Sequence, residues 1–282
     1  MGKVNKVISI KGAVNKIISC LSEKFPSKNI SYGIQFKVDQ GVVNIYHTGK
    51  LVYQGSEPGW VQFHKILDDC YIKLGIDVVP HDIKFPFIGC DEAGKGEFLG
   101  PLVVSCLWVK DKTVYIELWK QGVMDSKDLS KSSLWKIYSF IDNLKKKRDG
   151  ISVSHVVLHP QKFDHVYSVM KNIARVLDFI YMGAILRLPL SKMIVVDRFS
   201  PSALLSSFIP NVVLVEKAEK YVPVAGASVV AKVLYEKWIE ENVPEDVVKV
   251  LRRSDLSIDR KKNIIGDKDI SRWVKNAFKS TK

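Results

Sequence analysis

An apolar strand that runs directly into two acidic residues is the feature that most restricts the fold of this chain. Residues 85–90 are mostly apolar, and Asp91 and Glu92 follow them at once. A pair of carboxylates at the end of a buried strand is costly to desolvate unless a cation holds it. The glycine-lysine-glycine turn at 94–96 can bring bare backbone and a positive charge close to an anion. The segment therefore predicts a metal ion beside a phosphate group.

Composition favours a folded protein that binds a polyanion. The chain has 282 residues, of which 46% are hydrophobic, so it can hold one large domain or two ordinary ones. Its formal net charge of +13 favours a polyanionic partner such as nucleic acid. No apolar run approaches the ~18 residues that a membrane span requires, and no secretory signal is recognisable. We therefore expect no membrane partner and a cytoplasmic location.

The four cysteines are expected to be reduced. They are scattered through the chain without the Cys-x-x-Cys spacing of a zinc site or the pattern of a disulfide framework. Cys90 and Cys106 fall within apolar segments, where a cysteine serves as a small core residue. The other two are Cys20 and Cys70.

We expect two domains, residues 1–80 and 81–282. In the first, apolar residues at helical spacing predict an amphipathic helix over 4–24. Alternating segments predict strands at 31–38, 42–46 and 50–54, joined by hairpin turns, and a helix follows at about 57–74. The first domain is thus a small α+β unit with one face of its sheet open to solvent.

From residue 85 onward strands alternate with helices, which is typical of an α/β domain. Strands are predicted at 85–91, 101–109, 151–158, 192–197 and 212–215, with a weaker one at 112–117. Helices are predicted at about 131–147, 161–186 and 224–241. Because Asp91 and Asp197 each end an apolar strand, a sheet that pairs these two strands brings the two acids together.

Four acids are the candidate metal ligands: Asp91, Glu92, Asp197 and Glu236. Oxygen-only ligands favour Mg²⁺ or Mn²⁺ over zinc. Two such ions can activate a water and stabilise the leaving oxygen of a phosphodiester. Ordinary structural explanations also exist, because an aspartate at a strand end often caps a turn and a glutamate on a helix often pairs with a lysine. The residue pattern alone leaves both explanations open.

Four blocks of the sequence together resemble ribonuclease HIII, the branch of the type 2 ribonucleases H that carries an amino-terminal substrate-binding domain. The blocks are residues 91–102, residues 122–130 with an Asp-Ser-Lys-x-Leu-Ser motif, residues 195–199 and residues 217–232. Ribonuclease HII shares much of this pattern. The HIII branch is favoured by the Gly-Lys-Gly turn, which usually reads Gly-Arg-Gly in HII. It is also favoured by residues 46–55, which resemble a hairpin of the HIII amino-terminal domain.

The resemblance implies an α/β fold with a ribonuclease H-like, mixed five-stranded sheet and flanking helices. A small α+β domain, similar to half of the TATA-binding-protein fold, would precede it. The implied reaction is hydrolysis of the RNA strand of RNA–DNA hybrids, leaving 5′-phosphate and 3′-hydroxyl ends. Asp91, Glu92, Asp197 and Glu236 would hold two Mg²⁺ or Mn²⁺ ions around the scissile phosphate.

The resemblance also implies substrate contacts around the catalytic acids. Gly94, Lys95 and Gly96 would grip the RNA backbone and test its 2′-hydroxyl, which distinguishes RNA from DNA. Ser126 and Lys127 would contact phosphate.

A second set of implied contacts lies in the amino-terminal domain. Tyr46, Lys50 and Gln54, together with Tyr53, would bind the hybrid through phosphate contacts and packing. Residues 1–81 have lysines as their only strong cations, so this binding should depend strongly on salt and weakly on sequence. A single acting chain without a protein partner is the simplest expectation.

Two other functions remain open on the sequence alone. One is HII-like cleavage at a single ribonucleotide embedded in DNA. The chain has no obvious counterpart of the junction-reading tyrosine of HII, and Tyr235 is only a weak candidate for it. The other is a non-catalytic module that binds nucleic acid and in which the acids are structural. Substitution of Asp91 distinguishes enzyme from binding module.

Overall fold

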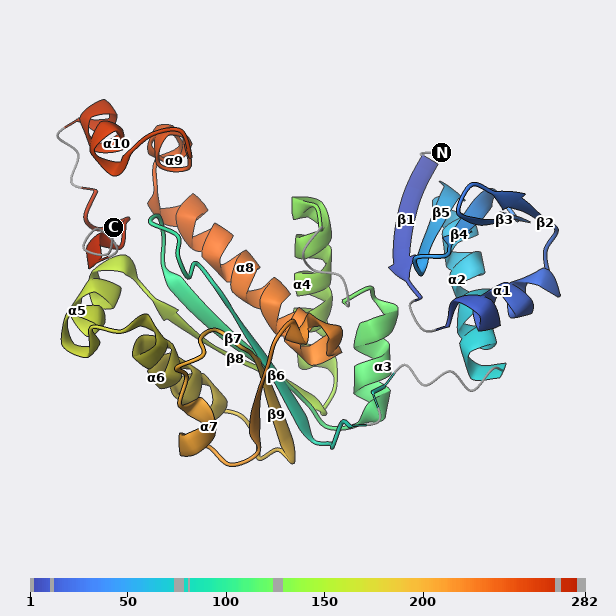
Figure 1. Ribbon diagram of the computed structural model, residues 1–282, viewed down its shortest axis with the longest axis horizontal. Coiled ribbons are helices and arrows are strands. Elements are labelled where there is room, and N and C mark those ends of the chain that lie inside the picture. Colours follow the sequence, from blue (N-terminus) through green and yellow to red (C-terminus); the bar gives the residue numbers. More distant parts are fainter. Residues whose placement is uncertain are drawn as a thin grey trace. The chain divides into compact units, whose positions relative to one another are not determined.

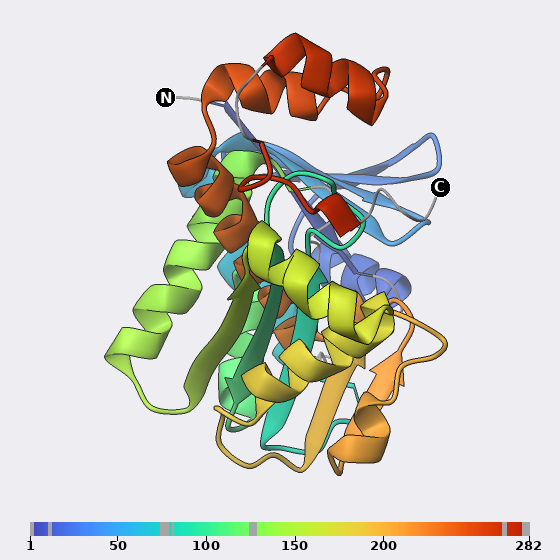
Figure 2. The ribbon, with the colours of Figure 1, turned by 90° about the vertical axis from the view of Figure 1, so that its left-hand side faces the viewer.

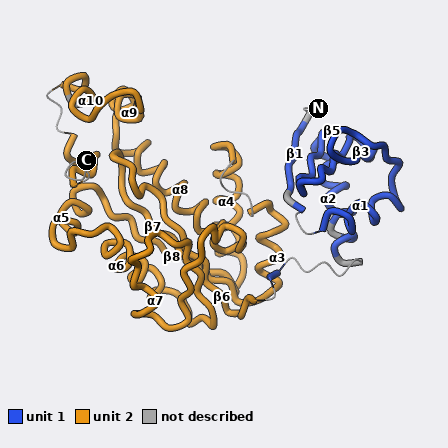
Figure 3. Tube along the Cα trace, viewed as in Figure 1, with its two compact units in different colours: residues 1–81 blue, residues 82–282 orange. Residues whose placement is uncertain are grey.

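The structure is a computed structural model that contains two compact units (Figure 1). It describes residues 3–10, 13–73, 79–80, 82–123, 129–266 and 270–277. The units comprise residues 1–81 and 82–282 (Figure 3), so the division falls one residue later than the sequence placed it. Within the described ranges, no helix has the length and apolar character needed to cross a membrane.

The amino-terminal unit is an antiparallel five-stranded sheet with two helices packed against one face (Figure 1). The sheet has the order β1-β5-β4-β3-β2. Its strands are β1 (Lys3–Ser9), β2 (Ser27–Ile30), β3 (Gly33–Val38), β4 (Gly41–Tyr46) and β5 (Lys50–Ser56), and its helices are α1 (Val14–Ser22) and α2 (Glu57–Lys73). Alternate strand residues, among them Phe36, Ile45 and Leu51, are buried.

The predicted helix over residues 4–24 is wrong for its first part. Residues Lys3–Ser9 form β1, which pairs antiparallel with β5 so that Val7 lies opposite Val52. Only Val14–Ser22 is helical. The β-branched residues of the segment suit a strand as well as a helix, and the free edge of β5 decides between them.

The second unit contains the mixed five-stranded sheet expected from the sequence, which confirms that prediction. Its order is β10-β9-β6-β7-β8. The strands are β6 (Phe87–Ala93), β7 (Leu102–Val109), β8 (Ile151–Leu158), β9 (Met193–Asp197) and β10 (Val212–Val215). β6, β7 and β8 are antiparallel neighbours, whereas β9 lies parallel to both β6 and β10.

Helices cover both faces of this sheet, as expected (Figure 1). One side carries α3 (Lys112–Lys120), α4 (Lys131–Lys147) and α8 (Val222–Asn242), and the other carries α5 (Pro160–Met170), α6 (Ile173–Ile185) and α7 (Leu205–Phe208). A short 3₁₀ turn, η1 (Ala218–Lys220), precedes α8. Helices α9 (Glu245–Leu251) and α10 (Ile258–Ile265) follow α8 and lie beyond its carboxyl end (Figure 2).

Two predicted elements of this unit are wrong because local capping groups were overlooked. The weak strand at 112–117 is helix α3, whose first turn is capped by the Asp111 carboxylate, an acceptor for the amides of Thr113 and Val114 at 2.9 and 3.1 Å. The long helix over 161–186 is two helices. They part where Lys171 turns left-handed and Asn172 caps the second helix.

The prediction of reduced cysteines is also wrong, because the structure contains two disulfide bonds. Cys20 on α1 joins Cys70 on α2 across 50 residues of sequence. Cys90 on β6 joins Cys106 on β7, which lies directly opposite in the antiparallel register. Sequence spacing carries no information on these two juxtapositions, since the first depends on helix packing and the second on strand register.

Candidate active site

Two parallel strands bring Asp91 and Asp197 to the same end of the sheet. Cys90 on β6 lies opposite Val196 on β9, and each aspartate follows one residue later. Parallel neighbours end at the same edge, so the two carboxylates are neighbours. Asp197 Oδ1 also accepts the amide of Ala218 at 2.9 Å, which ties the end of β9 to η1.

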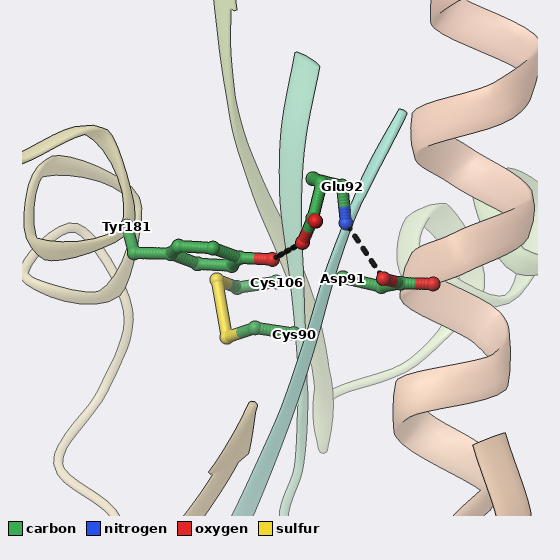
Figure 4. The surroundings of a disulfide bond; sticks show 5 residues. All are labelled: Cys90, Asp91, Glu92, Cys106 and Tyr181. Atoms are coloured by element: carbon green, nitrogen blue, oxygen red, sulfur yellow. Dashed lines mark hydrogen bonds between the residues drawn. A yellow bond between two sulfur atoms is a disulfide. The ribbon is translucent and has the colours of Figure 1, made fainter. Parts of the chain in front are cut away.

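The strand pleat directs the side chains of Asp91 and Glu92 to opposite sides of β6 (Figure 4). Asp91 points toward α8, where it hydrogen-bonds Ser228, and its Oδ1 accepts the amide of Glu92 at 2.8 Å. Helix α8 packs closely here because β6 has a glycine, Gly89, at which a Cβ atom would lie 2.2 Å from the nitrogen of Val224. The glycine therefore sets how near α8 comes to Asp91.

Glu92 is held from the opposite side by a tyrosine and a lysine. The Tyr181 hydroxyl on α6 donates to Glu92 Oε2 (Figure 4), and Lys95 Nζ lies 3.6 Å from Glu92 Oε1. Lys95 also donates to the Phe199 carbonyl, and the Phe199 ring stacks on Tyr181 with centroids 5.1 Å apart. Sequence reasoning missed Tyr181, because nothing in the sequence of α6 indicates which residue faces β6.

The glycine turn after Glu92 has a left-handed backbone at both of its glycines. Gly94 and Gly96 both have φ of 83°, a left-handed conformation that favours glycine. A Cβ atom on Gly94 would lie 2.2 Å from the Pro101 carbonyl oxygen, whereas one on Gly96 would meet no atom within 4 Å. Gly94 is thus packed inward, and Gly96 presents open backbone beside Lys95.

Burial and mutual repulsion raise the pKa values of the acids on β6. Burial raises the pKa of Asp91 to about 7, and the charges of Glu92 and Asp197 contribute to the rise. Burial also raises the pKa of Glu92, although the bonds from Tyr181 and Lys95 oppose this. A cation near these three acids would stabilise their ionised forms.

The structure does not bring Glu236 to the other acids. Glu236 forms an ion pair with Arg252, its Oε2 lying 2.6 Å from Arg252 Nη2. Asp91 meets α8 at Ser228, and eight residues of helix separate Ser228 from Glu236, or about 12 Å along the axis. The expectation for Glu236 therefore fails on helix register.

Glu219 is an acid that the sequence analysis did not name and that adjoins a residue bound to Asp197. Glu219 lies in η1 directly after Ala218, whose amide donates a hydrogen bond to Asp197. One carboxylate oxygen of Glu219 is buried. The signal was available, since residues 217–232 form one of the blocks singled out in the sequence.

The donor chemistry of the site fits a divalent cation. Asp91, Glu92 and Asp197 offer only oxygen ligands, which Mg²⁺ and Mn²⁺ prefer. Among the described residues, no three His, Cys, Asp or Glu side chains converge closely enough to enclose a metal ion. Ser126 and Lys127, expected to contact phosphate, lie outside the described residues, as does Asp125.

Tyr46, Lys50 and Gln54 share the face of the amino-terminal sheet that the helices leave uncovered. The register places Gln54 opposite both Asn5 and Val42. A hollow of about 980 Å³ lies on this face, and its lining includes Lys28, Gln35, Lys37 and Gln54. Tyr53 points the other way. It is fully buried and packs against Trp60 and Phe63 of α2, so its expected role as a contact is replaced by core packing.

Comparison with protein families gives a match to the model described as Ribonuclease HII over residues 88–256. The Ribonuclease HIII of Protochlamydia amoebophila is 28% identical over 214 residues, which cover 70% of this chain and 66% of that protein. The chain thus spans slightly under two thirds of the length of this relative. The Ribonuclease HIII of Streptococcus agalactiae serotype Ia is 30% identical over 237 residues, covering 78% of this chain and 76% of the relative.

A solved structure has the same fold over nearly the whole chain. The crystal structure of Bst-RNase HIII in complex with Mn²⁺ aligns with a TM-score of 0.59 and 19% identity, covering 99% of this chain and 97% of that one. At this identity the likeness concerns the fold.

The raised pKa of Asp91 predicts a pH dependence of stability. The pKa of the Asp91 carboxyl is 3.8 in the unfolded chain and about 7 in the folded protein. Between these values only the folded state keeps the proton, so the free energy of unfolding should fall as pH rises through this window. In EDTA, the melting temperature should fall from pH 5 to pH 8 by several degrees more in the wild type than in Asp91→Asn. Calorimetry at both pH values measures this, and parallel curves for the two proteins would contradict it.

Proposed function

Because this chain belongs to the ribonuclease HII family, with ribonuclease HIII enzymes among its relatives, we propose that it is an endoribonuclease that hydrolyses the RNA strand of RNA–DNA hybrids. The observation that carries this proposal is the placement of Asp91 and Asp197 as neighbours at one end of the sheet, with Glu92 next in sequence and the open glycine turn following it. The acids can hold a cation, and the glycine turn with its Lys95 side chain can contact a phosphate. Together they suit a phosphodiester substrate. The net charge of +13 suits the same polyanion.

The chain's own residues orient both the acids and the substrate. Ser228 and the Glu92 amide fix Asp91, while Tyr181 and Lys95 fix Glu92, so the two adjacent carboxylates cannot rotate freely. Gly96 can approach the RNA backbone closely because no side chain intervenes, and a 2′-hydroxyl there would distinguish RNA from DNA.

We propose that these acids hold Mg²⁺ or Mn²⁺, two ions in the working enzyme. When bound, the ions supply Lewis-acid chemistry, lowering the pKa of water and offsetting charge on the phosphate and the leaving oxygen. Bst-RNase HIII was solved with Mn²⁺. The raised pKa values of Asp91 and Glu92 support a cation site, because burial and mutual repulsion disfavour the ionised carboxylates and a cation would offset both.

Glu219, rather than Glu236, is the fourth carboxylate in this proposal. It neighbours the Ala218 amide that binds Asp197, while Glu236 is engaged by Arg252. In this proposal Glu236 forms a surface ion pair between α8 and Arg252 and does not bind metal. Tyr235 is also unsuited to reading a ribonucleotide junction, because its hydroxyl is buried and donates to the Leu99 carbonyl at 2.9 Å.

We propose that the amino-terminal unit binds the hybrid on its uncovered sheet face. Lys28 and Lys37 line its hollow, Gln54 adds a hydrogen-bonding side chain, and Lys50 and Tyr46 lie on the same face. These groups suit phosphates without reading bases. We place the enzyme in the cytoplasm as a single acting chain.

The central test compares cleavage of two end-labelled duplexes by the wild type and by Asp91→Asn. One duplex is a full RNA–DNA hybrid, and the other is DNA with one embedded ribonucleotide. We expect the wild type to cut the hybrid at several sites with Mg²⁺ or Mn²⁺. The variant should lose at least ~100-fold in kcat and retain hybrid affinity. Cutting only at the lone ribonucleotide would indicate HII-like activity, and hybrid binding without cutting would indicate a binding module.

A matched pair of variants tests the fourth carboxylate. Glu219→Gln should lower kcat by about 10²-fold or more, because it removes a charge from the metal site. Glu236→Gln makes the same chemical change on α8 and should leave kcat within about twofold, with a small loss of stability from the broken pair with Arg252. Steady-state cleavage of the hybrid measures both, and the reverse ranking would restore Glu236 as the ligand.

Charge reversal on the amino-terminal sheet tests the binding face. Lys37→Glu and Lys50→Glu should each raise KM for the hybrid about three- to tenfold near 0.1 M salt and reduce the salt dependence of binding, with kcat nearly unchanged. Lys65→Glu, an equal charge change on the exposed side of α2, is the control. If all three variants raise KM equally, net charge rather than this face governs binding.

A further inference from the structure

A fully buried lysine, Lys275, stands out among the charged groups that the mechanism does not use. Its side chain has no exposed surface, and its Nζ donates to the carbonyls of Leu99, Gly100 and Pro101 at 3.3, 2.6 and 3.4 Å. An ammonium group has three N–H donors, so this group of carbonyls matches its capacity. Burying a charge is costly, and an apolar side chain of similar length would fill such a site at lower cost.

The backbone around Lys275 is bound to the same segment. The amide of Lys275 donates to the Phe98 carbonyl at 2.9 Å, and the amide of Gly100 donates to the Trp273 carbonyl at 2.8 Å. Leu99 and Val274 form an antiparallel bridge between these bonds. Residues 273–275 therefore act as a short strand along residues 98–100.

The segment 98–101 is in turn packed against the glycine turn. The Pro101 carbonyl, one of the three acceptors of Lys275, lies where a Cβ atom on Gly94 would be only 2.2 Å away. The Tyr235 ring is the next neighbour of Gly94, and its hydroxyl donates to the Leu99 carbonyl. Gly94 is therefore packed closely against the Pro101 carbonyl.

The far side of the carboxy-terminal segment is also anchored. The Asp164 carboxylate on α5 accepts the amides of Asn276 and Ala277 at 3.0 and 2.9 Å. Lys275 Nζ lies 6.0 Å from the ring centroid of Phe163, which is also on α5. Burial lowers the pKa of Lys275 to about 7, although Glu97 and Asp164 oppose the shift.

We propose that Lys275 is a positioning residue that fixes the Gly94–Gly96 turn in its substrate-binding conformation by holding the Leu99, Gly100 and Pro101 carbonyls. The assignment of substrate binding to this turn rests on the proposed function. The position of the turn itself does not, and it can be measured without substrate.

The first measurement is amide hydrogen exchange in the full-length, substrate-free protein, comparing wild type with Lys275→Met. Methionine fills a similar volume but cannot donate. We expect exchange within residues 94–101 to rise roughly tenfold or more, while β8 and α4 keep wild-type protection. A uniform rise over residues 82–277, or no change at 94–101, would overturn the proposal.

The second measurement is hybrid cleavage by the same variant. Lys275→Met should raise KM about tenfold, the effect of losing buried hydrogen bonds, with kcat within about threefold. Tyr115→Phe is the control, since it removes a buried hydrogen bond to the Val222 amide away from the turn. It should lower the melting temperature without raising KM. Equal KM changes in the two variants would indicate a stability effect and reject positioning.

A second substitution covers the case in which Lys275→Met does not fold. Tyr235→Phe removes the other side-chain donor to the Leu99 carbonyl and keeps the ring against Gly94. It should raise exchange at 94–101 and KM in the same direction but less, about threefold. Unchanged exchange in this variant would count against the proposal. A wild type that fails to cut any hybrid would overturn the proposed function alone, since the exchange result still tests Lys275.

Discussion

Repulsion among the carboxylates at the ends of β6 and β9 is the constraint on which the rest of the second unit depends. Parallel pairing of the two strands makes Asp91 and Asp197 neighbours, and Glu92 follows on the next residue. The surrounding structure supplies what this charge requires. Ser228 from α8 and Tyr181 from α6 each donate to one acid, from opposite sides of the same strand. These two contacts require a helix on each face of the sheet, α8 on one and α6 on the other, and both helices reach β6.

The parts of the fold that the sequence predicted are those that depend on local pattern. Strands β7 and β8 and helix α4 follow from apolar runs and a cap at Ser130, and they form where expected. The errors lie where distant partners or single caps decide. Lys3–Ser9 becomes a strand because β5 offers a free edge, and Asp111 turns a short apolar segment into α3. The two disulfides depend on contacts between elements that no spacing rule encodes.

The residues of the candidate site also fall into those that local sequence pattern reveals and those that only tertiary contacts reveal. The sequence identifies Asp91, Glu92 and Asp197 because each lies at the end of an apolar strand, and such a position can be recognised from the order of the residues alone. Glu236 is a candidate only through its position on a helix. Each helical residue advances 1.5 Å along the axis, so the two turns between Ser228 and Glu236 are enough to place Glu236 away from the other acids. Tyr181 and Lys275 could not be identified in this way. Their importance comes from facing a particular carboxylate or carbonyl, which only tertiary packing determines.

The pairing of residues 98–101 with residues 273–275 also has a consequence for the order in which the molecule matures. The two partners are separated by about 175 residues of chain. Ribosomes add about 5–20 residues per second, so roughly 9–35 s pass between the synthesis of the glycine turn and that of Lys275. During that time the acids of β6 already exist, but the Gly100 and Pro101 carbonyls lack the donor that Lys275 later supplies. Residues 98–101 therefore reach their final pairing only after the last part of the sequence has been translated.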